Sequence, residues 1–165
     1  MVLPTQTKKK IFLVEDNAFY QFLIRYHLER KGYEVTVFES GEDALEMMHQ
    51  APDLILLDHN LAGLLSGTDV LKMMKKITDP IPVIVLTAQE NINVAVEVFK
   101  SGAVDYINKN DLVVSELVDN VHKQIHMYED QKKALSKQKM ERLSLIFASI
   151  MLSIVSLSLI VISLF

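Results

Sequence analysis

The chain has 165 residues, and its 17 lysine and arginine residues stand against 21 aspartate and glutamate residues, for a formal charge of −4. This length accommodates one ordinary domain with an appendage, whereas two compact domains would be cramped. The balanced charge argues against a nucleic-acid-binding surface. The absence of cysteine excludes disulfides, thiolate metal sites and a thiol nucleophile.

Five short apolar runs of strand length follow one another, each with a helical pattern behind it. The expected strands are residues 10–14, 34–38, 54–57, 82–86 and 104–107. The helical patterns cover residues 19–28, 41–48, 68–77 and 91–100, and a last one starts near residue 111. This alternation predicts an α/β fold: a doubly wound, flavodoxin-like sheet of five parallel strands with helices on both faces.

Polar side chains stand at the ends of four predicted strands. Glu15 and Asp16 follow the first strand, Asp58 the third, Thr87 the fourth and Lys109 the fifth. Because ligands of such sheets bind outside the carboxyl ends of the strands, we expect these five side chains to surround one site.

The residue types at this edge indicate phosphoryl chemistry. Crowded carboxylates repel one another, so they favour a hard divalent cation such as Mg²⁺. A carboxylate beside Mg²⁺ and a lysine can attack phosphorus, because both cations neutralise the transferred group. The sequence has neither a P-loop nor a base for a hydroxyl acceptor. We therefore expect the protein to accept a phosphoryl group itself rather than to act as an enzyme on a separate substrate.

The sequence resembles the receiver domain of two-component response regulators over about residues 8–126. The resemblance is carried by "LVEDN" with Glu15 and Asp16, "ILLDHNL" with Asp58, "VLTA" with Thr87, and "GAVDYINK" with Tyr106 and Lys109. It implies that Asp58 accepts a phosphoryl group from a sensor histidine kinase or a phosphotransfer protein, and that the chain carries out only this Mg²⁺-dependent phosphotransfer and its own dephosphorylation.

The resemblance also implies roles for the neighbouring residues. Mg²⁺ would be bound by Glu15, Asp16, Asp58 and the main-chain carbonyl of Asn60. The phosphoryl group would be bound by Lys109 and by the hydroxyl of Thr87, which would shift toward it.

Two further roles follow from the same resemblance. Tyr106 would turn inward with Thr87 as a switch, and this would alter the face formed by the fourth helix and fifth strand, where a downstream protein would bind. Asn60 and Gln89 would set the rate of dephosphorylation.

The sequence departs from the family pattern in two loops. Asn110 follows Lys109, where the family usually has a proline in a cis bond, and Gly67 comes one residue later after Asp58 than usual. We therefore expect a longer and looser third loop. These departures leave open an alternative function, a phosphorylation-independent scaffold with a receiver fold that docks a kinase or membrane complex.

The C-terminal part has a different composition. Residues 127–142 form a helix-prone basic linker, and residues 145–165 contain no charged residue. About 20 apolar residues suffice to cross a bilayer, and flanking positive charge marks the cytoplasmic side. The sequence predicts a single-pass transmembrane helix over residues 143–165 that holds the receiver at the cytoplasmic face of the membrane. Burial of this helix against another subunit stays open, and so does a homodimer through Ser149, Ser153 and Ser156.

Two histidines offer a separate possibility. His122 and His126 are spaced to share a helix face and could bind zinc, but no third ligand is evident. The sequence therefore predicts a membrane-anchored, single-domain response regulator without a nucleic-acid partner. Whether the chain is the front of a longer sensor or enzyme stays open.

Overall fold

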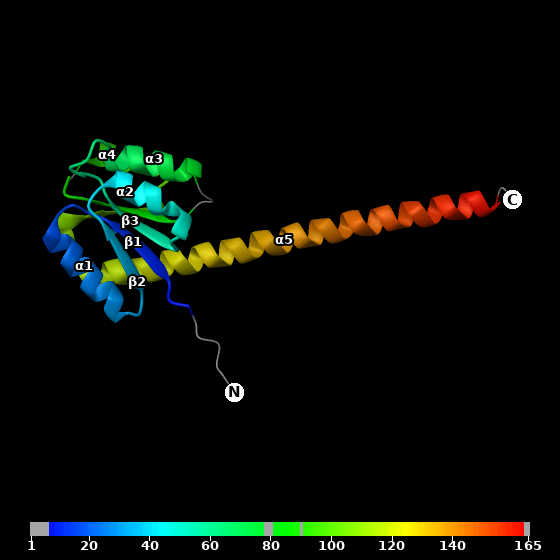
Figure 1. Cartoon of the computed structure of the whole chain (residues 1–165), viewed down its shortest axis with the longest axis horizontal. Coiled ribbons are helices and arrows are strands. Elements are labelled where there is room, and N and C mark those ends of the chain that lie inside the picture. The colour runs from blue at the N-terminus through cyan, green and yellow to red at the C-terminus, as the bar shows by residue number, and fades with distance from the viewer. Residues whose placement is uncertain (1–6, 78–80, 90, 164–165) are drawn as a thin grey trace, which may run out of the picture. The chain divides into compact units, whose positions relative to one another are not determined.

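The computed structural model describes residues 7–77, 81–89 and 91–163, with side chains of the last helix described up to residue 154 and at residue 156. Its centre is one parallel sheet in the order β2-β1-β3-β4-β5 (Figure 1). The strands are β1 (Lys10–Val14), β2 (Glu34–Phe38), β3 (Leu54–Asp58), β4 (Val83–Thr87) and β5 (Asp105–Asn108). This order confirms the predicted flavodoxin-like fold, with β4 and β5 each one residue later than expected.

Helices cover both faces of the sheet. They are α1 (Ala18–Arg30), α2 (Gly41–Glu46), α3 (Gly67–Ile77), α4 (Ile92–Lys100) and α5 (Val114–Ser163), with short 3₁₀ turns η1 (Met47–Gln50) and η2 (Lys109–Asp111). The layer of α2, α3 and α4 lies on one face, and α1 with the first part of α5 lies on the other (Figure 1).

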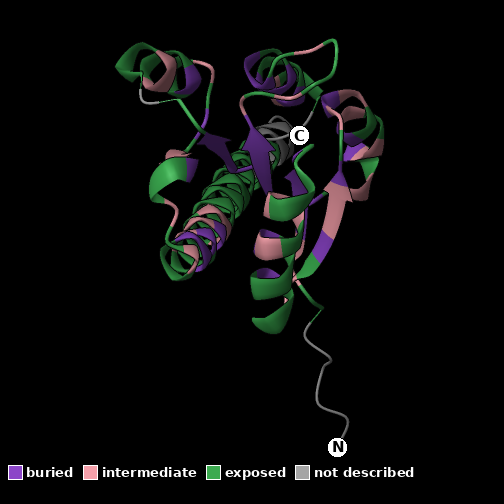
Figure 2. Ribbon diagram, turned by 90° about the vertical axis from the view of Figure 1, so that its left-hand side faces the viewer, coloured by how far each residue is buried: buried purple, intermediate pink, exposed green. Residues whose placement is uncertain are grey.

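The core consists of two apolar clusters separated by the sheet. Successive side chains of a strand point to opposite faces, so Phe12 and Val14 of β1 join one cluster while Ile11 and Leu13 join the other. The central strands are buried on both sides, as Figure 2 shows in purple. This burial explains why β3 and β4 are continuous apolar runs, and it makes the sheet a rigid base for the residues at its edge.

Polar caps and glycines set the helix boundaries. The side chains of Asn17, Ser40 and Asn91 accept hydrogen bonds from backbone N–H groups at the start of α1, α2 and α4, respectively. Gly32 and Gly102 follow α1 and α4 with φ angles of +92° and +101°, a conformation that side chains with a Cβ rarely adopt. The three caps stand in loops at the carboxyl edge of the sheet, and the two glycines stand in loops at the opposite edge, where β2 and β5 begin.

The chain forms two compact units, Met1–His126 and Met127–Phe165. Within the described residues no helix is both long and apolar enough to cross a membrane, so the transmembrane helix predicted over residues 143–165 is not found there. The described side chains include only the first part of that uncharged stretch, and about 20 apolar residues are needed to cross. Residue 155 and residues 157–165 of the prediction lie outside the described side chains.

Candidate functional site

The carboxyl edge of the sheet brings the five predicted strand-end residues together. Glu15 directly follows β1, Asp58 is the last residue of β3, and Thr87 is the last residue of β4. Asp16 comes one residue after Glu15, and Lys109 begins η2 directly after β5. Because the strands are parallel and in register, all of these positions lie at one end of the sheet.

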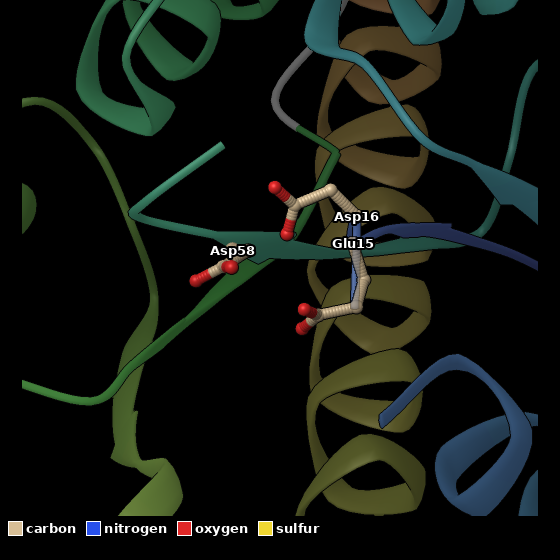
Figure 3. Close-up of side chains that lie close together, drawn as sticks. All are labelled: Glu15, Asp16 and Asp58. Atoms are coloured by element: carbon tan, nitrogen blue, oxygen red, sulfur yellow. The ribbon is translucent and has the colours of Figure 1, made fainter. Parts of the chain in front are cut away.

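Three carboxylates form a cluster at this edge (Figure 3). One oxygen of each of Glu15, Asp16 and Asp58 lies within 4.8 Å of the others. Glu15 and Asp58 are buried, and Asp16 is exposed. Hard carboxylate oxygens with one solvent-facing member suit a cation that keeps some of its waters, so the cluster fits Mg²⁺.

The buried ammonium group of Lys109 contacts two of these carboxylates. Its Nζ atom lies 2.6 Å from Oε2 of Glu15 and 2.8 Å from Oδ2 of Asp58, and it is 4.7 Å from the ring centroid of Tyr20. Burial alone would lower the pKa of Lys109, but the hydrogen bonds and charges of Asp58 and Glu15 outweigh burial and raise the pKa above 10.5. Lys109 is therefore a cation at neutral pH.

Glu15 is held at the base of the cluster. Its carboxylate accepts a hydrogen bond from the backbone N–H of Asn17 at 3.2 Å. Burial raises the pKa of Glu15; the contact with Lys109 opposes this rise, and the charge of Asp58 adds to it. The neighbouring ammonium of Lys109 therefore stabilises the charged form of this buried carboxyl group.

Gln89 connects three of the other predicted site residues. Its backbone N–H donates to Oγ1 of Thr87 at 3.1 Å, and its side-chain amide donates to Oδ1 of Asn60 at 3.3 Å. The hydroxyl of Tyr106, which is half-buried, donates to the carbonyl of Gln89 at 2.6 Å. The loop between β4 and α4 is thus bonded to β5 on one side and to the loop after Asp58 on the other.

The loop between β3 and α3, which the sequence predicts to be longer and looser than usual, is held by carboxylates from outside it. The backbone N–H of Ala62 donates to Oδ2 of Asp16 at 3.1 Å. The backbone N–H groups of Leu64 and Leu65 both donate to Oε1 of Glu42, each at 3.1 Å. Sequence reasoning missed Glu42, because an acidic residue in the first turn of a helix is ordinary.

The loop after β5 accommodates Asn110 without a cis bond. No described peptide bond is cis, and the backbone N–H of Asn110 donates to Oδ1 of Asn108 at 2.9 Å. The side-chain amide of Asn110 donates to the carbonyl of Ala88 at 3.0 Å. The residue that replaces the usual proline therefore ties the Lys109 loop to the loop that follows Thr87.

The histidine pair on α5 lies away from this edge. The rings of His122 and His126 are 4.3 Å apart, and Nδ1 of His122 is 3.0 Å from the hydroxyl of Tyr33. Among the residues that the structure describes, the acidic triad is the one group of three side chains placed to hold a metal ion. No described side chain therefore completes a zinc site with His122 and His126.

The fold and the acidic pocket with its lysine are consistent with phosphorylation of an aspartate. The family model for the response regulator receiver domain matches residues 11–122, and the chain belongs to this family. As a receiver domain it is a phosphoacceptor rather than a classical enzyme, and its acidic triad is typical of the Mg²⁺ site of such domains.

Known proteins agree with this assignment. The chain is 39% identical over 98 residues to the luminescence regulatory protein LuxO of Vibrio campbellii, an alignment that covers 59% of this chain and 21% of LuxO. It is 30% identical over 129 residues to the DNA-binding transcriptional regulator NtrC of Escherichia coli, covering 78% and 27% of the two chains. The chain thus spans about a quarter of the length of these relatives or less.

The solved structure of the signal receiver domain of a putative LuxO repressor protein from Vibrio parahaemolyticus has the same fold. It superposes with a TM-score of 0.72 at 26% identity, covering 78% of this chain and 98% of that one. The likeness therefore extends over nearly all of an isolated receiver domain.

Proposed function

We propose that this receiver accepts a phosphoryl group on Asp58 from its histidine kinase, or from a phosphotransfer protein, and signals through changed protein contacts. The observation that supports the proposal best is the contact of Lys109 with both Glu15 and Asp58 beside Asp16. A structural lysine would need one carboxylate partner, whereas this arrangement leaves a surplus of negative charge that suits a metal ion.

The chemistry of the step follows from the contacts of Asp58. Its Oδ1 accepts a hydrogen bond from the backbone N–H of Asn60 at 3.2 Å, and its Oδ2 contacts Lys109. An oxygen of Asp58 forms a bond to phosphorus while the bond from phosphorus to the donor histidine nitrogen breaks, and that nitrogen keeps the electron pair. The ammonium of Lys109 then contacts the phosphoryl oxygens.

Mg²⁺ would be held by Glu15, Asp16, Asp58 and the main-chain carbonyl of Asn60, and when bound it would neutralise negative charge on the transferred group. The exposure of Asp16 leaves room for waters and for a phosphoryl oxygen on that side. Lys109 supplies the second positive charge from the buried side of the site.

The switch is assigned to Thr87 and Tyr106. The hydroxyl of Thr87 accepts a hydrogen bond from Gln89, so its own hydrogen can be donated to a phosphoryl oxygen. Movement of Thr87 would displace Gln89, whose carbonyl is bonded to Tyr106. The signal would thereby reach β5 and α4.

The face formed by α4 and β5 is suited to a downstream protein. Ile92, Val96 and Phe99 on α4 are 79%, 45% and 48% exposed and recur at helical spacing. Asn60 and Gln89, which are bonded to each other, stand beside Asp58 and are assigned to control access of water and thus the lifetime of the phosphorylated form.

The phosphodonor experiment tests this proposal directly. The full chain is incubated with Mg²⁺ and acetyl phosphate, and a base-labile adduct is detected by mass spectrometry. The Asp58→Asn variant should not form the adduct, and Asp119→Asn, which alters an exposed carboxylate on α5, should behave like the unaltered chain. Absence of an adduct at saturating donor would count against phosphoryl acceptance.

One observation favours the second function, a phosphorylation-independent scaffold. The hydroxyl of Tyr106 is bonded to Gln89 while its ring packs against the core, and Asn110, which stands in place of the usual proline, ties the neighbouring loop to Ala88. If this is the signalling arrangement, a partner captured by the unaltered chain should be captured equally well by Asp58→Asn. A loss of capture in that variant would support the phosphorylation-dependent function.

We also propose that the C-terminal segment anchors the receiver at the cytoplasmic face of a membrane. This part rests on the sequence: residues 145–165 carry no charge, and the preceding stretch holds Lys132, Lys133, Lys137, Lys139 and Arg142. A chain lacking residues 143–165 should leave the membrane fraction. Continued sedimentation of the shortened chain with membranes would contradict the anchor.

A further inference from the structure

The loop between β3 and α3, residues 59–67, is closed at its base directly over Asp58. The backbone N–H of Gly67 donates to the carbonyl of His59 at 3.0 Å. A Cβ atom at Gly67 would overlap the carbonyl oxygen of Asp58 and would come within 2.7 Å of Cα of His59. A shift of the loop at Gly67 would therefore also displace the backbone of Asp58.

Two carboxylates from outside this loop hold its middle, one from the loop between β1 and α1 and one from the first turn of α2. Asp16 accepts from Ala62, and Glu42 accepts from both Leu64 and Leu65 through one oxygen. Successive backbone N–H groups that converge on an anion form a stable concave site, and hydrogen bonds to a charged acceptor are stronger than those between neutral groups. The loop is thus fixed by charge from outside itself.

The carboxylate of Glu42 is not needed by its own helix. The first turn of α2 is capped by Ser40, whose hydroxyl accepts from the backbone N–H of Asp43 at 3.2 Å and donates to Oδ2 of Asp43 at 2.7 Å. Glu42 instead reaches across to the β3–α3 loop, and its Oε2 is buried. The hydrogen bonds to Glu42 therefore stabilise the loop between β3 and α3 rather than the start of α2.

The contact fixes one leucine inward and presents the other outward. Leu65 packs against the core cluster beneath α2 and α3. Leu64 is 98% exposed although its backbone N–H is bonded to Glu42. Because the side chain of Leu64 buries almost no apolar surface, the hydrogen bond to Glu42 is what stabilises the backbone conformation of this residue.

We propose that Glu42 is a positioning residue for the phosphorylation site. By holding Leu64 and Leu65, it fixes the loop that carries Asn60 and Ala62, and it thereby keeps the carbonyl of Asn60 and the carboxylate of Asp16 arranged for a divalent cation. The consequence for the cation rests on the proposed function. The fixing of the loop does not rest on it, because it follows from hydrogen bonds within the protein alone.

The first measurement is amide hydrogen exchange over residues 59–67 in the full chain without Mg²⁺. Glu42→Ala should speed exchange at Leu64 and Leu65 by about tenfold or more, since it removes a charged acceptor from two amides. Glu42→Gln keeps an acceptor oxygen, so its exchange rates at Leu64 and Leu65 should lie between those of the unaltered chain and those of Glu42→Ala. Glu46→Ala, which removes the same charge from the exposed side of α2, should match the unaltered chain.

The second measurement is the dissociation constant for Mg²⁺ alone, followed through tyrosine fluorescence. Glu42→Ala should raise it by about tenfold, the size expected when a group that orients metal ligands is lost, and Glu42→Gln should restore most of the affinity. Unchanged exchange in Glu42→Ala would overturn the fixing of the loop. Faster exchange with an unchanged dissociation constant would reduce Glu42 to a structural role and overturn the proposal.

The two measurements also separate this proposal from the proposed function. If Asp58 accepts no phosphoryl group but Glu42→Ala still weakens Mg²⁺ binding, the function fails while the positioning role stands. Exchange of the β3 amides serves as the control for folding, because these amides lie in the centre of the sheet.

Discussion

The ammonium group of Lys109 lies 2.8 Å from the carboxylate of Asp58, and both side chains are buried. Lys109 thus places one positive charge against two buried carboxylates, Asp58 and Glu15. A lysine in this position stabilises the free site and is also placed to stabilise a phosphorylated one. The contact between Lys109 and Asp58 therefore contributes both to the stability of the fold and to the phosphorylation of Asp58.

Replacing this lysine should separate the two effects. In Lys109→Met the free energy of unfolding without Mg²⁺ should fall by about 3 kcal/mol, because two buried carboxylates lose their partner. Added Mg²⁺ should recover part of this loss and should bind more tightly than before, since a competing positive charge is gone. Urea denaturation with and without Mg²⁺ measures both effects. Lys123→Met, on the exposed side of α5, is the control, and equal stability of the two variants would contradict the prediction.

The geometry of Tyr106 leads to a second prediction. Tyr106→Phe keeps the ring packed against the core but removes the 2.6 Å hydrogen bond to the carbonyl of Gln89. The free energy of unfolding should fall by about 1 kcal/mol, and amide exchange in the β4–α4 loop should become faster. Phosphorylation of Asp58 by acetyl phosphate should proceed at a similar rate, because the hydroxyl does not touch Asp58. A large loss of phosphorylation would show that Tyr106 acts on the site itself.

How far the sequence could predict this molecule depends on whether a feature follows from regular structure or from the path of a loop. The apolar runs of β3 and β4 predicted buried parallel strands, and parallel strands necessarily bring residues such as Asp58 and Thr87 to one edge. The fold was predictable for this reason, and so was the meeting of the strand-end residues.

Contacts between loops had no such periodic signal. Glu42 lies 22 residues before Leu64, and nothing in the spacing indicates that its carboxylate meets that backbone. The bond from Asn110 to the carbonyl of Ala88 is equally hidden, since the departure from proline suggested only a changed path. The membrane segment is a different case, because its signal is compositional and extends into residues outside the described side chains.

Lys75 on α3 allows a test of the electrostatics away from the site. Its half-buried ammonium donates to the carbonyl of Ile81 at 2.8 Å, and burial lowers its pKa below 10.5. Between the folded pKa and 10.5, the unfolded chain binds more protons than the folded chain, so the free energy of unfolding rises with pH through this window. Lys75→Met should lack this rise when unfolding is followed in urea at a series of alkaline pH values. A rise of the same size in the variant would show that another group is responsible.

The close approach of Gly67 to the backbone of Asp58 gives the last prediction. In Gly67→Ala the added methyl group meets backbone atoms of Asp58 and His59, which cannot rotate away, so the end of β3 or the start of α3 must shift. We expect a loss of about 1 to 3 kcal/mol in the free energy of unfolding, as for other overpacked sites. We also expect slower phosphorylation by acetyl phosphate, because the carboxylate of Asp58 moves with its backbone. Gly102→Ala is the matched comparison: its φ of +101° strains any residue with a Cβ, and the nearest atoms are side-chain carbons of Lys75. Its phosphorylation rate should change less, and a larger effect at residue 102 than at residue 67 would contradict the assignment of Gly67 as the base of the loop.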